Sequence, residues 1–217
     1  MISRIEQQAK AVIEEKEGAV LLPEDGYTNM KYPKFLPLMR FRVDQYDLSG
    51  FGHVMFMHTT TRMGMELITM SFMPSKCLAL PYLLIDAMSM KNKKCVFVEY
   101  YGCGAEGFND QGLKEIHDRY ISLPDYPEKD NWYIEERMPY SLIKSGVPEA
   151  LVSMAEDSVK TYLELAEGAA SIPDYKDKLK SFRERMIVCG NPSSKTLNML
   201  LGKDGARTFM EKVIMPV

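Results

Sequence analysis

The sequence predicts an α+β fold in which helices flank a central antiparallel sheet. Between Met39 and Tyr101 apolar and polar residues alternate with a period of two, as they do in half-buried strands. The links between these strands are shorter than the crossover of about a dozen residues that parallel neighbours need. Helical periodicity precedes and follows this region, and no repeat, low-complexity tract or linker divides the chain. We therefore predict a single layered domain that spans residues 1–217.

Composition and charge exclude several classes of protein. The chain has 217 residues, of which 46% are hydrophobic and 26% charged, and a formal net charge of -3. It has no run of about 18 uncharged apolar residues, so no transmembrane helix is expected. Glu6, Glu14 and Glu15 do not fit a secretory signal. The acidic balance argues against a general nucleic-acid binder. We expect a cytoplasmic protein with neither a membrane nor a nucleic acid as partner.

The first predicted element is an amphipathic helix, which Gly18 ends. Its apolar residues recur at helical spacing, with Glu and Lys on the other face. They are Ile2, Ile5, Ala9, Val12 and Ile13. The following segment, up to about Pro37, is rich in Pro, Gly and Tyr and is expected to be an irregular loop.

Strands are expected at residues 41–48, 51–60, 65–73, 82–90 and 95–101, with a sixth at 138–143. Pro74 stops the third strand, and the polar residues 91–94 make a short hairpin loop between the fourth and fifth. Helices are expected afterwards at residues 111–121, 148–166, 174–189 and 194–213. Pro148 suits the first turn of the second of these, and Gly202 interrupts the last.

The sequence has no fingerprint of a bound nucleotide or metal. Glycine-rich phosphate-binding motifs, a G-x-S-x-G nucleophile elbow and an H-E-x-x-H zinc helix are all missing. The 4 cysteines and 3 histidines show no zinc-ligand spacing. The cysteines are Cys77, Cys95, Cys103 and Cys189. We expect free thiols, no metal and no bound cofactor.

The chain contains 17 methionines, which fall mostly inside the predicted strands and helices. Adaptable core packing is one use for so many flexible side chains. The alternative is a pocket for a large, flat, apolar ligand.

Three polar residues are candidates for chemistry. Asp86 lies within the most apolar strand, where loss of hydration raises a carboxyl pKa and makes the group a candidate general acid. The alternative is that Asp86 faces solvent or caps a backbone group. His58, also in an apolar strand, is either a site residue or a hydrogen-bonded histidine without a catalytic role. Asn191 precedes Pro192 and the last helix, where Asn ordinarily makes a turn or cap.

Asp86 and Asn191 each lie in a short sequence motif, and the motifs follow one another in a defined order. Ser-Phe-Met-Pro at 71–74 is followed by Leu-Pro-Tyr-Leu-Leu-Ile-Asp at 80–86 and Cys-Val-Phe-Val-Glu at 95–99. Asn-Pro-Ser-Ser-Lys-Thr at 191–196 precedes Leu-Leu-Gly at 200–202 and an apolar closing segment at 209–214. A weaker similarity is Trp132 followed by Met-Pro-Tyr-Ser at 138–141. Together these pieces resemble the ferredoxin-dependent bilin reductases and the related red chlorophyll catabolite reductases.

The resemblance implies a three-layer α/β/α sandwich that binds a linear tetrapyrrole between the sheet and the C-terminal helices. Reduced ferredoxin would supply electrons and the protein would supply protons, without a metal or flavin. Asp86 corresponds to the aspartate that protonates the bilin, and Asn191 to a position near the pigment. His58 corresponds to another histidine of the family, nearer the N-terminus, when a gap is placed in the alignment. Thr69 stands where the phycocyanobilin-forming member has a histidine on the preceding strand.

Two other functions stay open. A non-catalytic tetrapyrrole carrier on the same fold would bind pigment tightly, and the pigment would not bleach on addition of reduced ferredoxin. An unrelated α+β enzyme would have an exposed Asp86 and no large apolar cavity beside the sheet. The basic residues of the 91–94 loop, or those of the helix at 174–189, are candidates for docking acidic ferredoxin.

Overall fold

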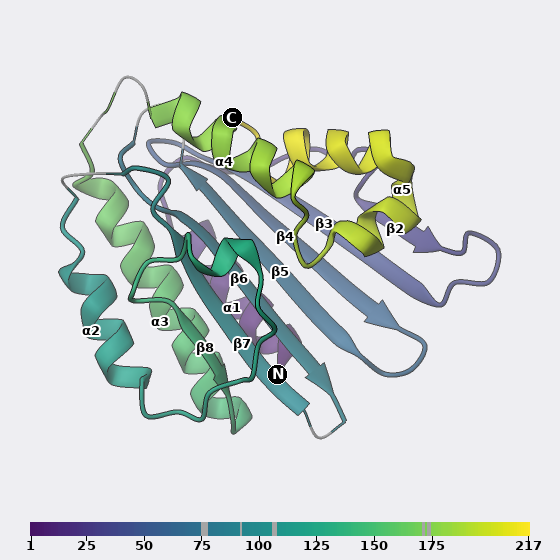
Figure 1. Ribbon diagram of the computed structural model, residues 1–217, viewed down its shortest axis with the longest axis horizontal. Coiled ribbons are helices and arrows are strands. Elements are labelled where there is room, and N and C mark those ends of the chain that lie inside the picture. The colour runs from purple at the N-terminus through teal and green to yellow at the C-terminus, as the bar shows by residue number, and fades with distance from the viewer. Residues whose placement is uncertain (75–77, 92, 106–107, 171, 173–174) are drawn as a thin grey trace.

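The alternating apolar residues form the long strands of one antiparallel sheet (Figure 1). The computed structural model describes residues 1–74, 78–91, 93–105, 108–170, 172 and 175–217. The sheet is 8-stranded, in the order β1-β3-β4-β5-β6-β7-β8, and β2 also pairs with β3. The strands are β1 Ala19–Leu21, β2 Asn29–Tyr32, β3 Met39–Leu48, β4 Gly52–Thr61, β5 Glu66–Pro74, β6 Tyr82–Met90, β7 Lys93–Tyr101 and β8 Leu142–Ser145.

Each long strand divides its side chains between two apolar cores, because successive side chains point to opposite faces. On β6, Leu83 and Ile85 belong to one core, whereas Tyr82 and Leu84 belong to the other. Asp86 has the parity of Tyr82 and Leu84 and therefore lies on their face of the sheet. This face carries the pocket described below.

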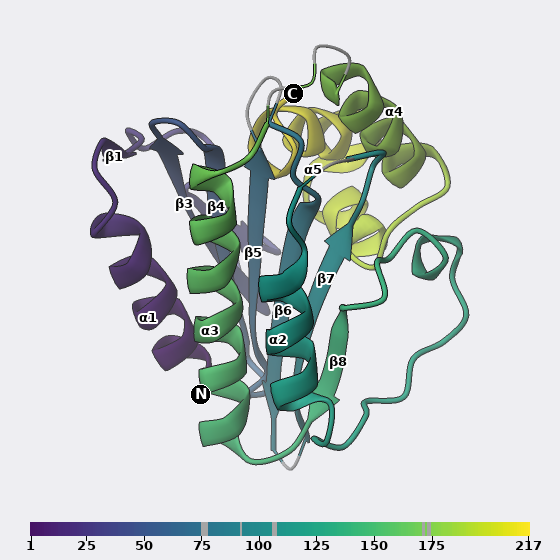
Figure 2. The ribbon, with the colours of Figure 1, turned by 90° about the vertical axis from the view of Figure 1, so that its left-hand side faces the viewer.

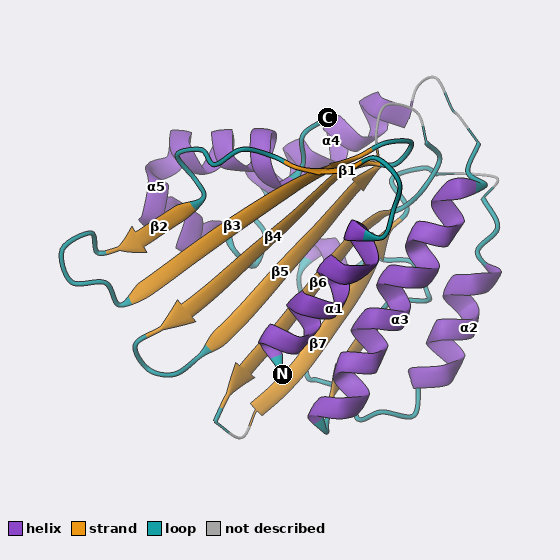
Figure 3. Ribbon diagram, turned by 180° about the vertical axis from the view of Figure 1, so that it is seen from behind, coloured by secondary structure: helices purple, strands orange, loops and turns teal. Residues whose placement is uncertain are grey.

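Three helices cover the first face: α1 Ile2–Glu14, α2 Gln111–Tyr120 and α3 Pro148–Glu167 (Figures 2 and 3). Helix α3 is 20 residues long and buries an apolar stripe against the sheet. Tyr162 from this stripe is fully buried and donates a hydrogen bond to the Pro81 carbonyl at 2.6 Å, which ties α3 to the segment that enters β6.

The C-terminal helices partly cover the opposite face. They are α4 Tyr175–Val188, α5 Ser194–Phe209 and the π-helical turn η2 Met210–Ile214 (Figure 1). Gly202 has φ 74°, a left-handed conformation that kinks α5. The predicted α+β class and the α/β/α sandwich with a central antiparallel sheet are confirmed. Within the described residues, no helix combines the length and apolar character that crossing a membrane requires.

The structure differs from the sequence prediction in two places, and a third prediction is only partly covered by the described residues. Strands β1 and β2 lie inside the predicted loop, and their short lengths leave no periodicity to read. The sixth predicted strand, 138–143, forms later as β8 at Leu142–Ser145, because residues 138–141 make a turn closed by a 3.1 Å hydrogen bond from Ser141 N to the Met138 carbonyl. Helix α4 is described from Tyr175, since its predicted start at Asp174 lies outside the described residues.

Candidate functional site

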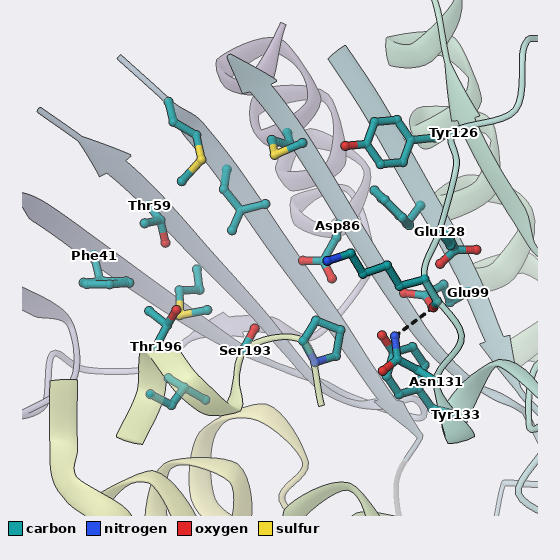
Figure 4. Close-up of a pocket in the computed structure, with 18 of the residues that line it drawn as sticks. Phe41, Thr59, Asp86, Glu99, Tyr126, Glu128, Asn131, Tyr133, Ser193 and Thr196 are labelled. Carbon is teal, nitrogen blue, oxygen red and sulfur yellow. Dashed lines mark hydrogen bonds between the residues drawn. The ribbon is translucent and has the colours of Figure 1, made fainter. Parts of the chain in front are cut away.

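A pocket of about 440 Å³ lies over the second face of the sheet (Figure 4). Its floor comes from β3 to β7, and its other walls come from the 126–137 loop and the start of α5. This volume falls within the range of small-molecule sites. The pocket lies between the sheet and the C-terminal helices, where the family resemblance places a tetrapyrrole.

Most of the pocket lining is apolar. The apolar side chains are Met39, Phe41, Met57, Met65, Leu67, Met88, Phe97, Tyr126, Pro127, Tyr133, Pro192 and Leu197. The sequence left open whether the methionines fill the core or line a site, and the structure shows both uses. Such unbranched, polarizable side chains adapt to an extended flat ligand.

Asp86 lies partly buried on the floor of this pocket (Figure 4). Its Oδ1 accepts a 2.5 Å hydrogen bond from the Thr69 hydroxyl, whose residue is its direct partner in the β5–β6 register. Burial raises the Asp86 pKa to about 6, although the Thr69 hydrogen bond lowers it. The carboxyl therefore exchanges a proton near neutral pH, as a general acid must.

Glu99 on β7 is a second carboxylate of the pocket and is only 3% exposed. Arg137 donates to its Oε1 from Nε at 2.6 Å, and the Tyr101 hydroxyl donates to the same atom at 2.9 Å. Burial raises the Glu99 pKa to about 7; Arg137 opposes this shift, and the negative charge of Asp86 adds to it. The site thus holds two acids that titrate near neutrality.

Thr59 adds an unpaired polar atom to the lining. The residue is 2% exposed, and its Oγ1 has no hydrogen-bond partner among the described residues. A buried hydroxyl without a partner costs about 1–3 kcal/mol. A polar group on a bound ligand would remove that cost.

Asn191 lies close to Asp86, because both residues line a small cavity of about 30 Å³ that shares Asp86, Pro192 and Ser193 with the main pocket. Its side chain also organises the turn before α5. Oδ1 accepts a 2.9 Å hydrogen bond from Ser193 N, and Nδ2 donates to the Met186 carbonyl at 3.2 Å. Asn191 therefore positions the Pro192–Leu197 wall of the pocket in addition to lying near the candidate acid.

The structure does not bring His58 to Asp86. His58 points to the α1 face of the sheet, where its Nδ1 contacts Glu6 Oε2 at 2.8 Å. Lys10 and Arg42 bind the other oxygen of Glu6. These ion pairs place His58 in a polar network between α1 and the sheet, on the side away from the pocket.

His53, the second histidine of β4, and the cysteines that the structure describes also lie outside the pocket lining. His53 contacts the Val213 carbonyl through Nε2 at 3.0 Å. Cys95, Cys103 and Cys189 are free thiols, and Cys77 lies outside the described residues. Within the described part of the chain, no three His, Cys, Asp or Glu side chains gather as metal ligands would.

Sequence reasoning did not select Glu99 or Thr59 as site residues. A signal was available for Glu99, since it ends the Cys-Val-Phe-Val-Glu segment at 95–99 and Glu is unusual in so apolar a run. Placing it beside Asp86 requires the β6–β7 register, which pairs Asp86 with Phe97 and Leu84 with Glu99. Nothing in the sequence marks the hydroxyl of Thr59 as unpaired.

Comparisons with known proteins establish the fold relationship. No protein-family profile matches this chain, and no curated protein matches it in sequence. Among solved structures, the fold is similar to that of phytochromobilin synthase from tomato, whose crystal structure contains biliverdin. The TM-score is 0.77, with 96% of this chain and 82% of that chain covered at 12% sequence identity. The resemblance to bilin reductases is therefore confirmed for the fold.

Proposed function

We propose that this protein binds a linear tetrapyrrole in the pocket above Asp86 and reduces one of its double bonds. The observation that carries the proposal is a proton-exchanging carboxyl on the floor of an apolar pocket, in a fold shared with a biliverdin-bound protein. An unrelated α+β enzyme would show an exposed Asp86 and no cavity beside the sheet, and neither feature is present.

Asp86 supplies a proton in this scheme. Reduction of a conjugated double bond consumes two electrons and two protons and leaves one hydrogen on each carbon. The apolar walls exclude water from the ligand's faces, so the proton comes from a group already in contact with the ligand. Thr69 holds Asp86 by Oδ1, which leaves Oδ2 as the oxygen that faces the ligand.

Reduced ferredoxin is the proposed source of single electrons. Lys91 and Lys93 are exposed in the hairpin between β6 and β7. Met88, which lines the pocket, lies two residues before the end of β6, so this hairpin begins within about 7 Å of the pocket rim along the strand. An acidic electron carrier docked there would approach the ligand closely.

The test is an absorbance titration of the purified protein with biliverdin, followed by addition of reduced ferredoxin without oxygen. A shifted pigment band that then converts to a new absorbing species supports a reductase, and product analysis identifies the reduced bond. A protein that leaves the biliverdin spectrum unchanged on mixing does not have the proposed ligand.

A tetrapyrrole carrier is the second candidate. Thr69 favours it, because the resemblance places a proton-donating histidine at this position and a threonine hydroxyl does not serve as a comparable acid. A carrier would shift the pigment band in the same titration, and the shifted band would persist after reduced ferredoxin is added.

A further inference from the structure

Glu99 and Asp86 are neighbours on the pocket floor. They lie on adjacent strands and on the same face, because Glu99 pairs with Leu84, two residues from Asp86 on β6. Such diagonal neighbours are separated by about 7–8 Å, within reach of one ligand lying across both strands. Figure 4 shows both carboxylates among the side chains that line the pocket.

One oxygen of Glu99 is available to a ligand. Arg137 and Tyr101 both donate to Oε1. The other carboxylate oxygen, Oε2, accepts no hydrogen bond among the residues that the structure describes. It is also absent from the fully buried polar atoms that have no partner, so it retains some exposed surface. The carboxyl is therefore anchored on one side and open to the pocket on the other.

The local charges favour a proton on this pair of acids. Arg137 is shared with Glu128, which binds both of its Nη atoms at 2.7 Å. Glu99 and Glu128 therefore share a single buried guanidinium, Asp86 adds a third carboxylate to the pocket, and the other cation of the lining, Lys129, is exposed. Two like charges in a poorly hydrated site ionise in sequence and not together.

We propose that Glu99 is the second proton donor of the pocket and acts with Asp86 on the same bound tetrapyrrole. The assignment rests on the proposed reductase function. The first electron from reduced ferredoxin and a proton from Asp86 give a neutral one-electron-reduced pigment. The second electron and a proton from Glu99 complete the new pair of C–H bonds, and solvent then returns one proton to each carboxylate.

The groups that face Glu99 account for its acidity. Burial and the charge of Asp86 raise its pKa, whereas Arg137 and the Tyr101 hydroxyl lower it, and the balance lies at about 7. Tyr133, from the 3-10 turn Trp132–Ile134, contributes only a neutral hydroxyl at this pH because its own pKa is raised. Proton donation by Glu99 therefore weakens as pH rises through about 7.

The experiment is a single turnover of bound biliverdin with reduced ferredoxin, comparing wild type with Glu99→Gln. We expect the variant to bind biliverdin with wild-type affinity and to accumulate the one-electron-reduced pigment, seen by electron paramagnetic resonance. Final product should form about 100-fold more slowly, the scale of a lost general acid. Its residual rate should lose the fall with pH that wild type shows near 7.

Glu136→Gln is the matched control. It removes a carboxylate from the same loop region, where Glu136 contacts Arg185 outside the pocket. We expect wild-type rates. If Glu99→Gln does not fold, Glu99→Asp replaces it. Aspartate keeps the negative charge opposite Arg137, but its side chain is one methylene shorter, so the carboxyl lies farther from the ligand. We expect a second step about 10-fold slower with binding unchanged.

The outcomes separate the two proposals. Wild-type protein that binds biliverdin without reducing it overturns the reductase function and this assignment together. Wild-type protein that reduces biliverdin, with the Glu99 variant equally fast and free of radical, overturns the assignment alone. Infrared titration of the unliganded protein adds a check, because Asp86→Asn should lower the Glu99 pKa by removing a neighbouring charge.

Discussion

At the scale of single residues, two polar groups of the pocket lower the folding stability of the unliganded protein. Asp86 is kept where ionisation is disfavoured, and Thr59 is kept without a hydrogen-bond partner. A chain selected only for stability would replace both by residues of similar shape. Their arrangement is typical of sites in which a ligand or a reaction uses the stored energy.

Asp86→Asn should slow turnover strongly and stabilise the unliganded protein. The folded carboxyl keeps its proton up to about pH 6, whereas the unfolded one loses it near 3.8. The folded state thus binds more protons in this window, so the wild type loses about 1–3 kcal/mol as pH rises through it. The variant lacks this loss. Thermal unfolding at pH 8 should show a higher Tm for the variant, and turnover should fall by about 10²–10⁴. An Asp86→Asn protein that turns over normally would remove Asp86 as proton donor.

Thr59→Val tests the unpaired hydroxyl with an isosteric change. We expect the unliganded variant to be more stable by about 1 kcal/mol, because the buried hydroxyl no longer lacks a partner. Biliverdin affinity should fall by about 5–10-fold if the hydroxyl pairs with a polar group of the pigment. Chemical denaturation and the pigment titration measure the two effects. An unchanged affinity would show that Thr59 makes no hydrogen bond to the ligand.

At the scale of secondary-structure elements, helix α1 is attached to the sheet by a polar network as well as by its apolar stripe. Glu6 is 5% exposed, and its carboxylate forms hydrogen bonds with Lys10, Arg42 and His58. Burial alone would raise its pKa, but these three partners outweigh burial and hold it at about 2. His58 therefore has a well-defined structural role on the α1 face.

Glu6→Gln should destabilise the protein at neutral pH by about 2 kcal/mol, a value reduced by the solvent exposure of Arg42. The folded carboxylate ionises at about 2 and the unfolded one at 4.5. The stabilisation is therefore complete above 4.5 and disappears as pH falls toward 2. Urea unfolding at pH 7 and pH 3 should show a difference between wild type and variant that shrinks at the lower pH. A constant difference would mean that the charge of Glu6 is not the cause.

At the scale of the whole molecule, the proposed reductase function needs a docking surface for an acidic electron carrier, and two basic surfaces are candidates. The β6–β7 hairpin adjoins the pocket rim, whereas Lys176 belongs to the outer helix α4. Electron transfer requires the carrier to approach the pigment, so the hairpin is the preferred surface.

Lys93→Glu should raise the KM for ferredoxin by about 5–10-fold and reduce its dependence on salt, with biliverdin affinity unchanged. Lys176→Glu makes the same charge change on α4 and should have little effect. Steady-state rates at two ionic strengths measure both variants. The opposite ranking would place the docking surface on α4.

The sequence alone determined the helices, the long strands and the candidacy of Asp86. Periodicity and hydration are local properties, so an acid within an apolar strand could be recognised without knowing its neighbours. The short strands β1 and β2 were not predicted, because three or four residues are too few to show a period-two alternation.

Only the tertiary structure decided which polar groups meet. His58 and Asp86 both sit in apolar strands, yet the strand register sends them to opposite faces of the sheet. The β6–β7 register brings Glu99 beside Asp86. The 126–137 loop and the turn at Asn191 close the pocket through contacts between residues distant in the chain. Register and loop packing depend on the free energy of the whole molecule, which no local stretch of sequence contains.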